Sequence, residues 1–221
     1  MIVVRGKRTH ELSRSGLEDL ISPFEDVLVD VGTGDGRFVL AHARANPKTF
    51  AIGLDPLASA LESSSASAAR KPERGGAPNA LFVVATAEDP PPELEGIADV
   101  VTVLLPWGRL LRGVLLGEAD VLGALARIAR PGAGMRIVLN NEIFEDPVPL
   151  DAAELPEATV DYALTELEPL YAQAGIRLDE ARLLGEDEVK RLRTTWSRRL
   201  AHGRSPRFLE LVGSVSSARG R

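Results

Sequence analysis

The sequence predicts an α/β fold in which a mostly parallel sheet of seven strands carries helices on both faces. Apolar runs alternate with helical patterns through the middle of the chain, which is typical of strand–helix–strand units. The length of 221 residues suits one domain, and no internal repeat or long linker divides the chain. We therefore expect a single domain over residues 1–215 and a disordered tail over residues 216–221.

Each expected element has a local signal. Continuous apolar runs predict the strands, because a parallel strand is buried on both faces. Helical periodicity predicts the helices, and the breakers Pro131-Gly132 and Gly175 predict where two of them end. In chain order we expect strands over 27–31, 50–54, 81–85, 100–105 and 136–140, helices over 37–45, 57–69, 119–129 and 161–174, and a late hairpin-like pair of strands over 176–184 and 208–215.

Two segments are expected to add to this framework. Residues 1–14 form a short N-terminal hairpin extension that turns at Arg5-Gly6. Residues 186–207 form a basic insertion between the last two strands.

The composition excludes several kinds of site. The chain has no cysteine, which excludes disulfides, thiolate metal sites and cysteine nucleophiles. It has 3 histidines, so a histidine-rich metal site is not expected and we assign no metal ligand. No apolar run approaches the roughly 18 residues of a membrane span, and the first ten residues mix basic and apolar side chains, so we expect a cytoplasmic protein without membrane contact.

The charges are segregated along the chain, although the net charge is −6. A basic stretch runs from Lys190 to Arg207 without an acidic residue, whereas residues 137–176 contain acids and no Lys or Arg. Two smaller basic clusters consist of Arg70, Lys71 and Arg74, and of Arg5, Lys7, Arg8 and Arg14. A basic cluster is commonly only a solvated face, but three of them in an acidic chain favour a surface that binds a polyanion.

The most informative segment is a glycine loop that follows the first apolar run. This run ends at Asp30-Val31 and continues as Gly-Thr-Gly-Asp-Gly over residues 32–36, and the second run ends at Asp55. Glycines let the backbone approach a ligand, and an acid after the second strand suits a ribose diol. The loop lacks the third glycine of the dinucleotide fingerprint, and its acid Asp35 would repel a pyrophosphate. A cationic, ribose-bearing cofactor without phosphate fits better, and S-adenosylmethionine is the common one; an ordinary strand-to-helix turn is the alternative.

Further candidates follow the later strands, because a ligand on such a sheet lies outside the carboxyl ends of the strands. The third strand delivers residues 85–88 to that edge, and the fourth delivers residues 104–108, which include Leu104, Pro106 and Trp107. A tryptophan after a proline at a strand end is unexpected in a chain with 5% aromatic residues. Trp107 either packs in the core or faces the ligand, and this segment alone does not separate the two.

The second tryptophan lies inside the most basic stretch of the chain. Trp196 is flanked by Arg193, Arg198 and Arg199, and an aromatic ring among arginines suits single-stranded nucleic acid, with the ring stacked on a base and the arginines on phosphates. The helical spacing of Val189, Leu192 and Leu200 equally suits an amphipathic helix that Trp196 anchors. If both tryptophans border the cofactor cleft, they can clamp an extruded base between them.

Several segments together resemble the aminoglycoside-resistance 16S rRNA (adenine(1408)-N(1))-methyltransferases, over nearly the whole chain. The glycine loop, Leu54-Asp55 and Ala85-Thr86-Ala87-Glu88 match, but the specific strings are Pro-Trp-Gly-Arg-Leu-Leu-Arg-Gly over 106–113 and Thr-Thr-Trp-Ser-Arg-Arg-Leu over 194–200. The resemblance implies a class I S-adenosylmethionine-dependent, Rossmann-like methyltransferase that acts on N1 of the decoding-site adenine at position 1408. It further implies 16S rRNA within the 30S subunit as the substrate. Because the lone pair of N1 is available without deprotonation, this reaction needs no general base, and we expect a monomer.

The resemblance also implies a role for particular residues. The S-adenosylmethionine pocket would be lined by Asp30, Gly32, Thr33, Gly34, Asp55, Pro56, Thr86, Ala87, Glu88 and Leu104, and by Thr194 or Thr195. Trp107 and Trp196 would stack on the flipped adenine, and the position of the Pro106 carbonyl suits its exocyclic amine. The rRNA phosphates would be held by Arg70, Lys71, Arg74, Arg198, Arg199, Arg204 and Arg207.

Three other functions remain open from the residues. A tRNA guanine-N7 methyltransferase would share the sheet and a nucleic-acid substrate, although the late Thr-x-Trp-x-Arg-Arg string is not expected there. A small-molecule methyltransferase would make the basic stretches incidental. A binding module would hold the cofactor or RNA without transferring methyl groups.

Overall fold

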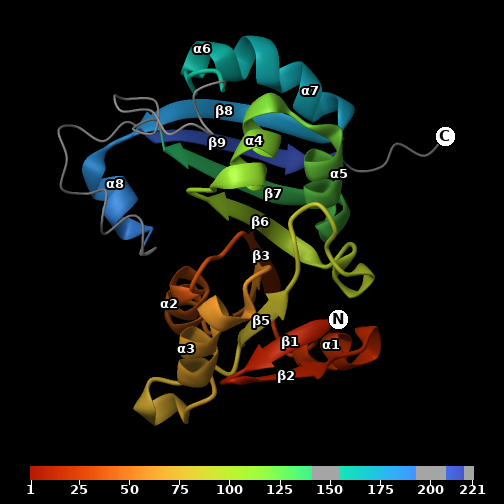
Figure 1. Ribbon diagram of the computed structural model, residues 1–221, viewed down its shortest axis with the longest axis vertical. Helices are drawn as coiled ribbons and strands as arrows, with labels where there is room; N and C mark the ends of the chain where they lie inside the picture. The colour runs from red at the N-terminus through yellow and green to blue at the C-terminus, as the bar shows by residue number, and fades with distance from the viewer. Residues whose placement is uncertain (141–154, 193–207, 217–221) are drawn as a thin grey trace.

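A computed structural model describes residues 1–140, 155–192 and 208–216 of the chain (Figure 1). Its described parts form one twisted sheet with helices packed on both faces. No helix in these ranges is long and apolar enough to cross a membrane.

The parallel core of the sheet consists of five neighbouring strands in the order β5-β4-β3-β6-β7. They are β3 (Asp26–Val31), β4 (Thr49–Asp55), β5 (Ala80–Val84), β6 (Ala98–Leu104) and β7 (Ala129–Asn140). The antiparallel strands β9 (Phe208–Val215) and β8 (Ile176–Leu184) follow β7. The order of the strands reverses between β3 and β6, and in such sheets this switch point is where ligands bind.

Alternating side chains on the strands build a core on each face of the sheet, and a third, smaller cluster lies beside α8 (Glu186–Arg191). Val27, Val29 and Val31 of β3 belong to the larger core, whereas Leu28 packs on the opposite face. The larger core is covered by α1 (Arg14–Ile21), α4 (Gly108–Leu116), α5 (Ala119–Ile128) and α7 (Glu168–Gln173), and the opposite face by α2 (Arg37–Ala45) and α3 (Ala58–Ala68). The short helix α8 packs through Val189 on Val138 and Phe208.

The N-terminal hairpin is present, but it is part of the sheet. Its strands β1 (Ile2–Arg5) and β2 (Arg8–Glu11) pair with each other, and β1 pairs with β5 through Val3 and Val83. The expectation of seven strands is therefore wrong, because these two strands extend the sheet to nine. The reason is that β5 would otherwise be an open edge, and β1 satisfies its free backbone groups.

Other boundaries differ from expectation for local reasons. The strand expected from residue 136 begins at Ala129, because Ala129 already pairs with Ala98 and the register shifts before Gly134 pairs with Val100. Pro131, which has no N–H to donate, falls in that irregular stretch. The helix expected over 161–174 consists of α6 (Val160–Tyr162), a π-helical turn (Ala163–Leu167) and α7.

Helices α1 and α4 were not expected, whereas α8 contains Val189 and agrees with the start of the amphipathic helix that was one of two interpretations of this stretch. In α4, Gly113 in the helix interior obscures the signal, yet a Cβ there would lie 2.4 Å from Val121 of α5, so this glycine allows the two helices to pack closely. The short α1 is capped at its N-terminus by Ser13, whose hydroxyl accepts a hydrogen bond from the Gly16 amide at 3.2 Å.

Candidate functional site

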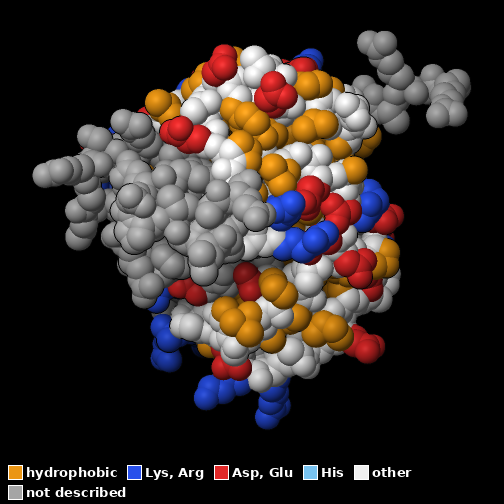
Figure 2. All heavy atoms as spheres, turned by 45° about the horizontal axis from the view of Figure 1, so that its top comes forward, with side chains coloured by type: hydrophobic (Ala, Val, Ile, Leu, Met, Phe, Trp, Pro, Cys, Tyr) orange, Lys and Arg blue, Asp and Glu red, His pale blue; other side chains and the backbone are white. Residues whose placement is uncertain are grey.

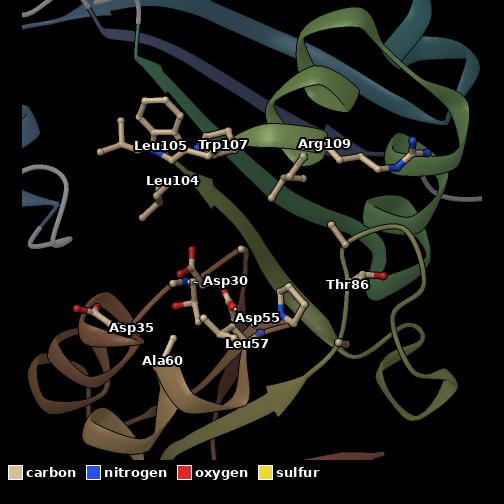
Figure 3. Close-up of a pocket in the computed structure, with 18 of the residues that line it drawn as sticks. Asp30, Asp35, Asp55, Leu57, Ala60, Thr86, Leu104, Leu105, Trp107 and Arg109 are labelled. Atoms are coloured by element: carbon tan, nitrogen blue, oxygen red, sulfur yellow. Dashed lines mark hydrogen bonds between the residues drawn. The ribbon is translucent and has the colours of Figure 1, made fainter. Parts of the chain in front are cut away.

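A cavity of about 630 Å³ lies at the carboxyl ends of β3, β4, β5 and β6, at the switch in strand order. Figure 3 shows the carboxylates of Asp30 and Asp55 on one side of it and Leu104, Leu105 and Trp107 on the other. The cavity is lined by Asp30, Gly32, Thr33, Gly34, Asp35, Phe38, Asp55, Pro56, Leu57, Ala60, Ala85, Thr86, Ala87, Glu88, Leu104, Leu105, Pro106, Trp107, Arg109 and Leu110.

The glycine loop after β3 needs its glycines for two different reasons. Gly32 has φ +72° and a Cβ there would lie 2.5 Å from the Leu110 side chain, so the loop packs directly under α4. Gly34 has φ +61°, but a Cβ there would meet no atom within 4 Å. The backbone at Gly34 therefore borders open space in the cavity, where a ligand can approach it closely.

Asp55 is fixed in place by two backbone amides. Its Oδ2 accepts a hydrogen bond from the Gly34 amide and its Oδ1 accepts one from the Leu57 amide, each at 2.9 Å. Burial raises the pKa of this carboxyl, and these two amides oppose the rise. Because each carboxylate oxygen can accept more than one hydrogen bond, both keep capacity for a pair of ligand hydroxyls.

Asp30 lies deeper, with 2% of its surface exposed, at the centre of the sheet. Its Oδ1 accepts a hydrogen bond from the Thr102 hydroxyl of β6 at 2.6 Å. Burial raises the pKa of Asp30 to about 7, although the Thr102 hydroxyl counteracts this and Asp55 adds to it. A carboxyl with this pKa is partly ionised at neutral pH, so a positive charge in the cavity would favour its charged form.

The turn after β6 has a strained backbone. Leu105 has φ +54°, in the left-handed region, and it precedes Pro106, a position where extended conformations are favoured. The Leu105 amide donates to the Val138 carbonyl at 2.8 Å, and its side chain is buried, which holds the turn in place. The turn presents Trp107 at the start of α4, with 38% of its surface exposed at the edge of the cavity. Strain of this kind is commonly found at functional sites.

Arg109 links the loop after β5 to the helices beside it. Its Nε lies 3.1 Å from Glu88 Oε1, and its guanidinium also pairs with Asp120 of α5. Figure 3 shows the guanidinium pointing away from Asp30 and Asp55, so Arg109 does not neutralise these acids. Sequence reasoning missed Arg109, because its role depends on two partners that are distant in the sequence.

The structure brings together every predicted cofactor or base residue that it describes. Asp30, Gly32, Thr33, Gly34, Asp55, Pro56, Thr86, Ala87, Glu88, Leu104, Pro106 and Trp107 all line the one cavity. Arg70, Lys71 and Arg74 are exposed in the connection between α3 and β5 and do not line it. The remaining candidates, Thr194, Thr195, Trp196, Arg198, Arg199, Arg204 and Arg207, lie outside the described residues. Asp35, Ala85 and Leu105, which the sequence placed at this edge of the sheet without a specific role, also line the cavity, and the lining residues that were not predicted are Phe38, Leu57, Ala60, Arg109 and Leu110.

The charges of the cavity favour a cationic ligand. Asp30, Asp35, Asp55 and Glu88 line it, and Arg109, the one basic side chain among the described lining residues, is paired with Glu88 and Asp120. Within the described ranges, no group of three or more His, Asp or Glu side chains could hold a metal ion. The acidic lining and the open space at Gly34 fit a cofactor with a positive charge, and the carboxylate of Asp55 fits a ribose. The same acids disfavour a cofactor with phosphates.

Comparisons with known proteins agree on one family. Residues 2–215 match the family model described as 16S rRNA (adenine(1408)-N(1))-methyltransferase. A protein of that name from Streptoalloteichus tenebrarius is 45% identical over 96% of this chain and 98% of its own. One from Escherichia coli is 35% identical over 98% of this chain and 99% of its own.

Solved structures give the same result. A tryptophan-substituted 16S rRNA (adenine(1408)-N(1))-methyltransferase from Catenulisporales acidiphilia, with cosubstrate SAM, superposes with a TM-score of 0.92 at 36% identity and covers 100% of this chain and 99% of its own. The 16S rRNA methyltransferase KamB superposes with a TM-score of 0.91 at 44% identity and covers 98% of this chain and 100% of its own.

Proposed function

The chain belongs to the 16S rRNA (adenine(1408)-N(1))-methyltransferase family, and from this premise we propose how its cavity positions the cofactor and the target base. The protein is an S-adenosylmethionine-dependent enzyme that methylates N1 of this adenine in 16S rRNA and thereby confers aminoglycoside resistance. The observation that carries the proposal is that one cavity joins a cradle for a cationic cofactor to a partly exposed tryptophan at the end of β6.

The residues on the β3 and β4 side of the cavity would hold S-adenosylmethionine. Asp55 would accept hydrogen bonds from the ribose hydroxyls, since its orientation is already fixed by the amides of Gly34 and Leu57. The open backbone at Gly34 would lie against the cofactor, and the loop of Thr86, Ala87 and Glu88 would border its adenine. When bound, the cofactor supplies a methyl group on a sulfonium sulfur. The acids of the cavity favour that positive charge.

The residues on the β6 side would hold the target base. Trp107 would stack on one face of the flipped adenine and Trp196, which lies outside the described residues, on the other. The ring nitrogen N1 has a free lone pair, so no proton must leave before methylation and no side chain has to act as a general base. The chain's contribution is to hold N1 at the correct distance and angle and to exclude water.

Two tryptophans are energetically sufficient for this task. Extruding a base costs a few kcal/mol. Stacking on an aromatic side chain returns about 1–3 kcal/mol per base. The methylated base is a cation, and the electron-rich face of an indole attracts a cation by about 0.5–2 kcal/mol. The carbonyl of Pro106 would accept a hydrogen bond from the exocyclic amine and so select the N1 edge.

We further propose that the substrate is the assembled 30S subunit in the cytoplasm and that the enzyme acts as a monomer. Arg70, Lys71 and Arg74 would contact rRNA phosphates, as would Arg198, Arg199, Arg204 and Arg207 in the segment that the structure does not describe. The added methyl group and its positive charge on the base oppose binding of the polycationic aminoglycosides, which is the physical basis of resistance.

Primer extension tests the substrate directly. The protein is incubated with S-adenosylmethionine and either 30S subunits or free 16S rRNA, and reverse transcription is then mapped. We expect a stop at the decoding-site adenine on 30S subunits and none on free rRNA, because N1-methyladenine blocks the Watson–Crick edge. A methylated product without a stop would favour guanine-N7 chemistry. Methylation of free rRNA would contradict the requirement for the 30S subunit. If no rRNA is methylated, a small-molecule methyltransferase or a binding module is favoured.

Substitution of Trp107 tests the base clamp. Trp107→Ala should reduce the rate of rRNA methylation by at least tenfold and leave the Kd for S-adenosylmethionine nearly unchanged, since the stacking is lost and the cofactor side is intact. Trp107→Phe keeps an aromatic face and should retain more activity. Equal rates for Trp107→Ala and the unsubstituted protein would rule out the clamp.

A further inference from the structure

Some basic side chains of this protein are used in ion pairs, and others are not. Arg14, Arg37, Lys48, Arg109, Arg112, Arg130, Arg136, Arg177, Arg182 and Lys190 each lie within 4.0 Å of a carboxylate. Among the described residues, no carboxylate lies at such a distance from Arg5, Lys7, Arg8, Arg70, Lys71 or Arg74, and all six are exposed. These six side chains come from two turns, the hairpin turn and the connection after α3.

The hairpin turn is hydrogen-bonded to Ser65 of α3. The Gly6 amide donates to the Ser65 hydroxyl at 2.9 Å, and this hydroxyl donates to the Val4 carbonyl at 2.7 Å. Ser65 is 3% exposed, and the bond from its hydroxyl to Val4 is buried. Because α3 leads directly into the connection that carries Arg70, the turn and the connection are held on the same helix.

The two basic turns meet at one hollow in the surface. A cavity of about 370 Å³ between the hairpin, α3 and β5 is lined by both Arg5 and Arg70. The connection is itself held in shape, because Arg44 Nε of α2 donates to the Gly75 carbonyl at 2.8 Å. Figure 2 shows basic side chains gathered at the lower edge of the molecule, where Figure 1 places the hairpin turn and this connection. The six side chains therefore form one basic surface.

The hairpin keeps two like charges in an unfavourable position. Arg5 and Arg8 are directly opposite each other across the two strands. Like charges in this arrangement destabilise a hairpin. Arg14, which belongs to the same cluster in the sequence, has a structural role instead: it pairs with Glu18 at 2.7 Å and donates to the carbonyls of Glu93 and Glu95. The stability of the fold explains Arg14 but not Arg5, Lys7 and Arg8.

The hairpin turn lies at the opposite end of β5 from the cofactor cavity. β1 is antiparallel to β5, so Arg5 is next to the start of β5, whereas Thr86 follows the end of β5. β5 has 5 residues at roughly 3.3 Å each, which gives a separation of about 17 Å along the strand. A polyanion bound here must therefore extend well beyond the base in the active site.

We propose that Arg5, Lys7 and Arg8 bind backbone phosphates of 16S rRNA outside the target loop, as an extension of the surface formed by Arg70, Lys71 and Arg74. This inference rests on the proposed function, because it takes the 30S subunit as the substrate. The contact reads no sequence; it adds affinity through charge and fixes the orientation of the enzyme on the subunit. It also makes the assembled subunit a better substrate than a short decoding-site RNA.

The test compares Arg8→Glu with Arg127→Glu. Arg127 is an exposed arginine on α5 without a carboxylate partner among the described residues, so the two variants change the net charge equally. Affinity for 30S subunits is measured between 50 and 200 mM salt, beside the Kd for S-adenosylmethionine and the melting temperature. We expect Arg8→Glu to weaken 30S binding about tenfold and to reduce the salt slope by about one. Arg127→Glu should change neither, and cofactor binding should be unchanged in both.

The controls keep this inference separate from the proposed function. Because Arg8→Glu places an acid opposite Arg5, the hairpin should not lose stability, so a loss of binding with an unchanged or higher melting temperature supports a phosphate contact. A short decoding-site RNA should bind both variants equally. Equal 30S binding by both variants, with wild-type methylation intact, would overturn this inference alone. Loss of binding to phosphatidylserine vesicles with unchanged 30S binding would assign the surface to lipid and overturn it as well. Absence of wild-type methylation would overturn the proposed function.

Discussion

The free energy of unfolding should fall as the pH rises, because Asp30 ionises in the folded protein, and replacing Asp30 with asparagine should abolish this fall. Burial raises the pKa of Asp30 from its ordinary value of 3.8 to about 7, so between these values the folded protein holds one more proton than the unfolded chain. Over this window the free energy of unfolding falls by about 1.4 kcal/mol per pH unit, about 4 kcal/mol in total. The stabilising contribution is thus complete below about pH 4 and is lost above about pH 7.

The assay is urea unfolding of the cofactor-free protein and of Asp30→Asn at pH 5 and pH 8. Asparagine does not titrate, and its amide oxygen can still accept the hydrogen bond from Thr102, which is 2.6 Å from Asp30 in the native protein. The difference in free energy of unfolding should therefore shift by about 3 kcal/mol in favour of the variant between pH 5 and pH 8. A difference that is the same at both pH values would refute the assignment of the raised pKa to this carboxyl.

Three further substitutions, two of them with a matched control variant, test other features. Gly34→Ala and Gly96→Ala each add a Cβ at a positive φ, +61° and +65°, where no atom lies within 4 Å, so each should lower the free energy of unfolding by about 1–2 kcal/mol. Calorimetry should show weaker S-adenosylmethionine binding only for Gly34→Ala. Equal affinities of the two variants would contradict a ligand at that loop. Arg109→Ala should raise the KM for S-adenosylmethionine several-fold and change kcat less, because Glu88 loses its partner. The control Arg112→Ala breaks only an ion pair with Glu118 and should change neither KM nor kcat. Asn79→Ala removes hydrogen bonds to the carbonyls of Ala43, Asn46 and Thr49 and should lower the free energy of unfolding by about 1–3 kcal/mol in urea, and an unchanged value would show that water replaces them.

The sequence predicted those parts of the fold that are buried on both faces. The strands of the parallel core are mostly continuous apolar runs, so their positions follow from composition and length, except for the first residues of β7, which include the exposed Pro131. The attachment of the hairpin to the sheet could not be predicted in this way. All four residues of β2 are exposed, and the pairing of β1 with β5 depends on backbone groups, which carry no side-chain signal. The eight-residue α1 is likewise too short to give a clear periodic pattern.

The same distinction holds for the candidate site. Gly34 and Asp55 were predictable, because a glycine loop after one apolar strand and an acid after the next are a known arrangement for binding a ribose-bearing cofactor. The role of Arg109 was not predictable, because it depends on Glu88 and Asp120, which only the folded chain brings together. The raised pKa of Asp30 also needed the structure, since it results from complete burial.

The strained turn at Leu105 has a consequence for redesign of the substrate range. The Leu105 side chain belongs to one hydrophobic cluster with Val189 of α8 and with Leu192, the residue that ends this helix. Four residues later the chain reaches Trp196. A single leucine thus joins the turn that presents Trp107 to the helix that precedes the second tryptophan, although the two are far apart in the sequence. A library that varies one of these segments alone also alters the packing contacts of the other, so the two segments are best varied together.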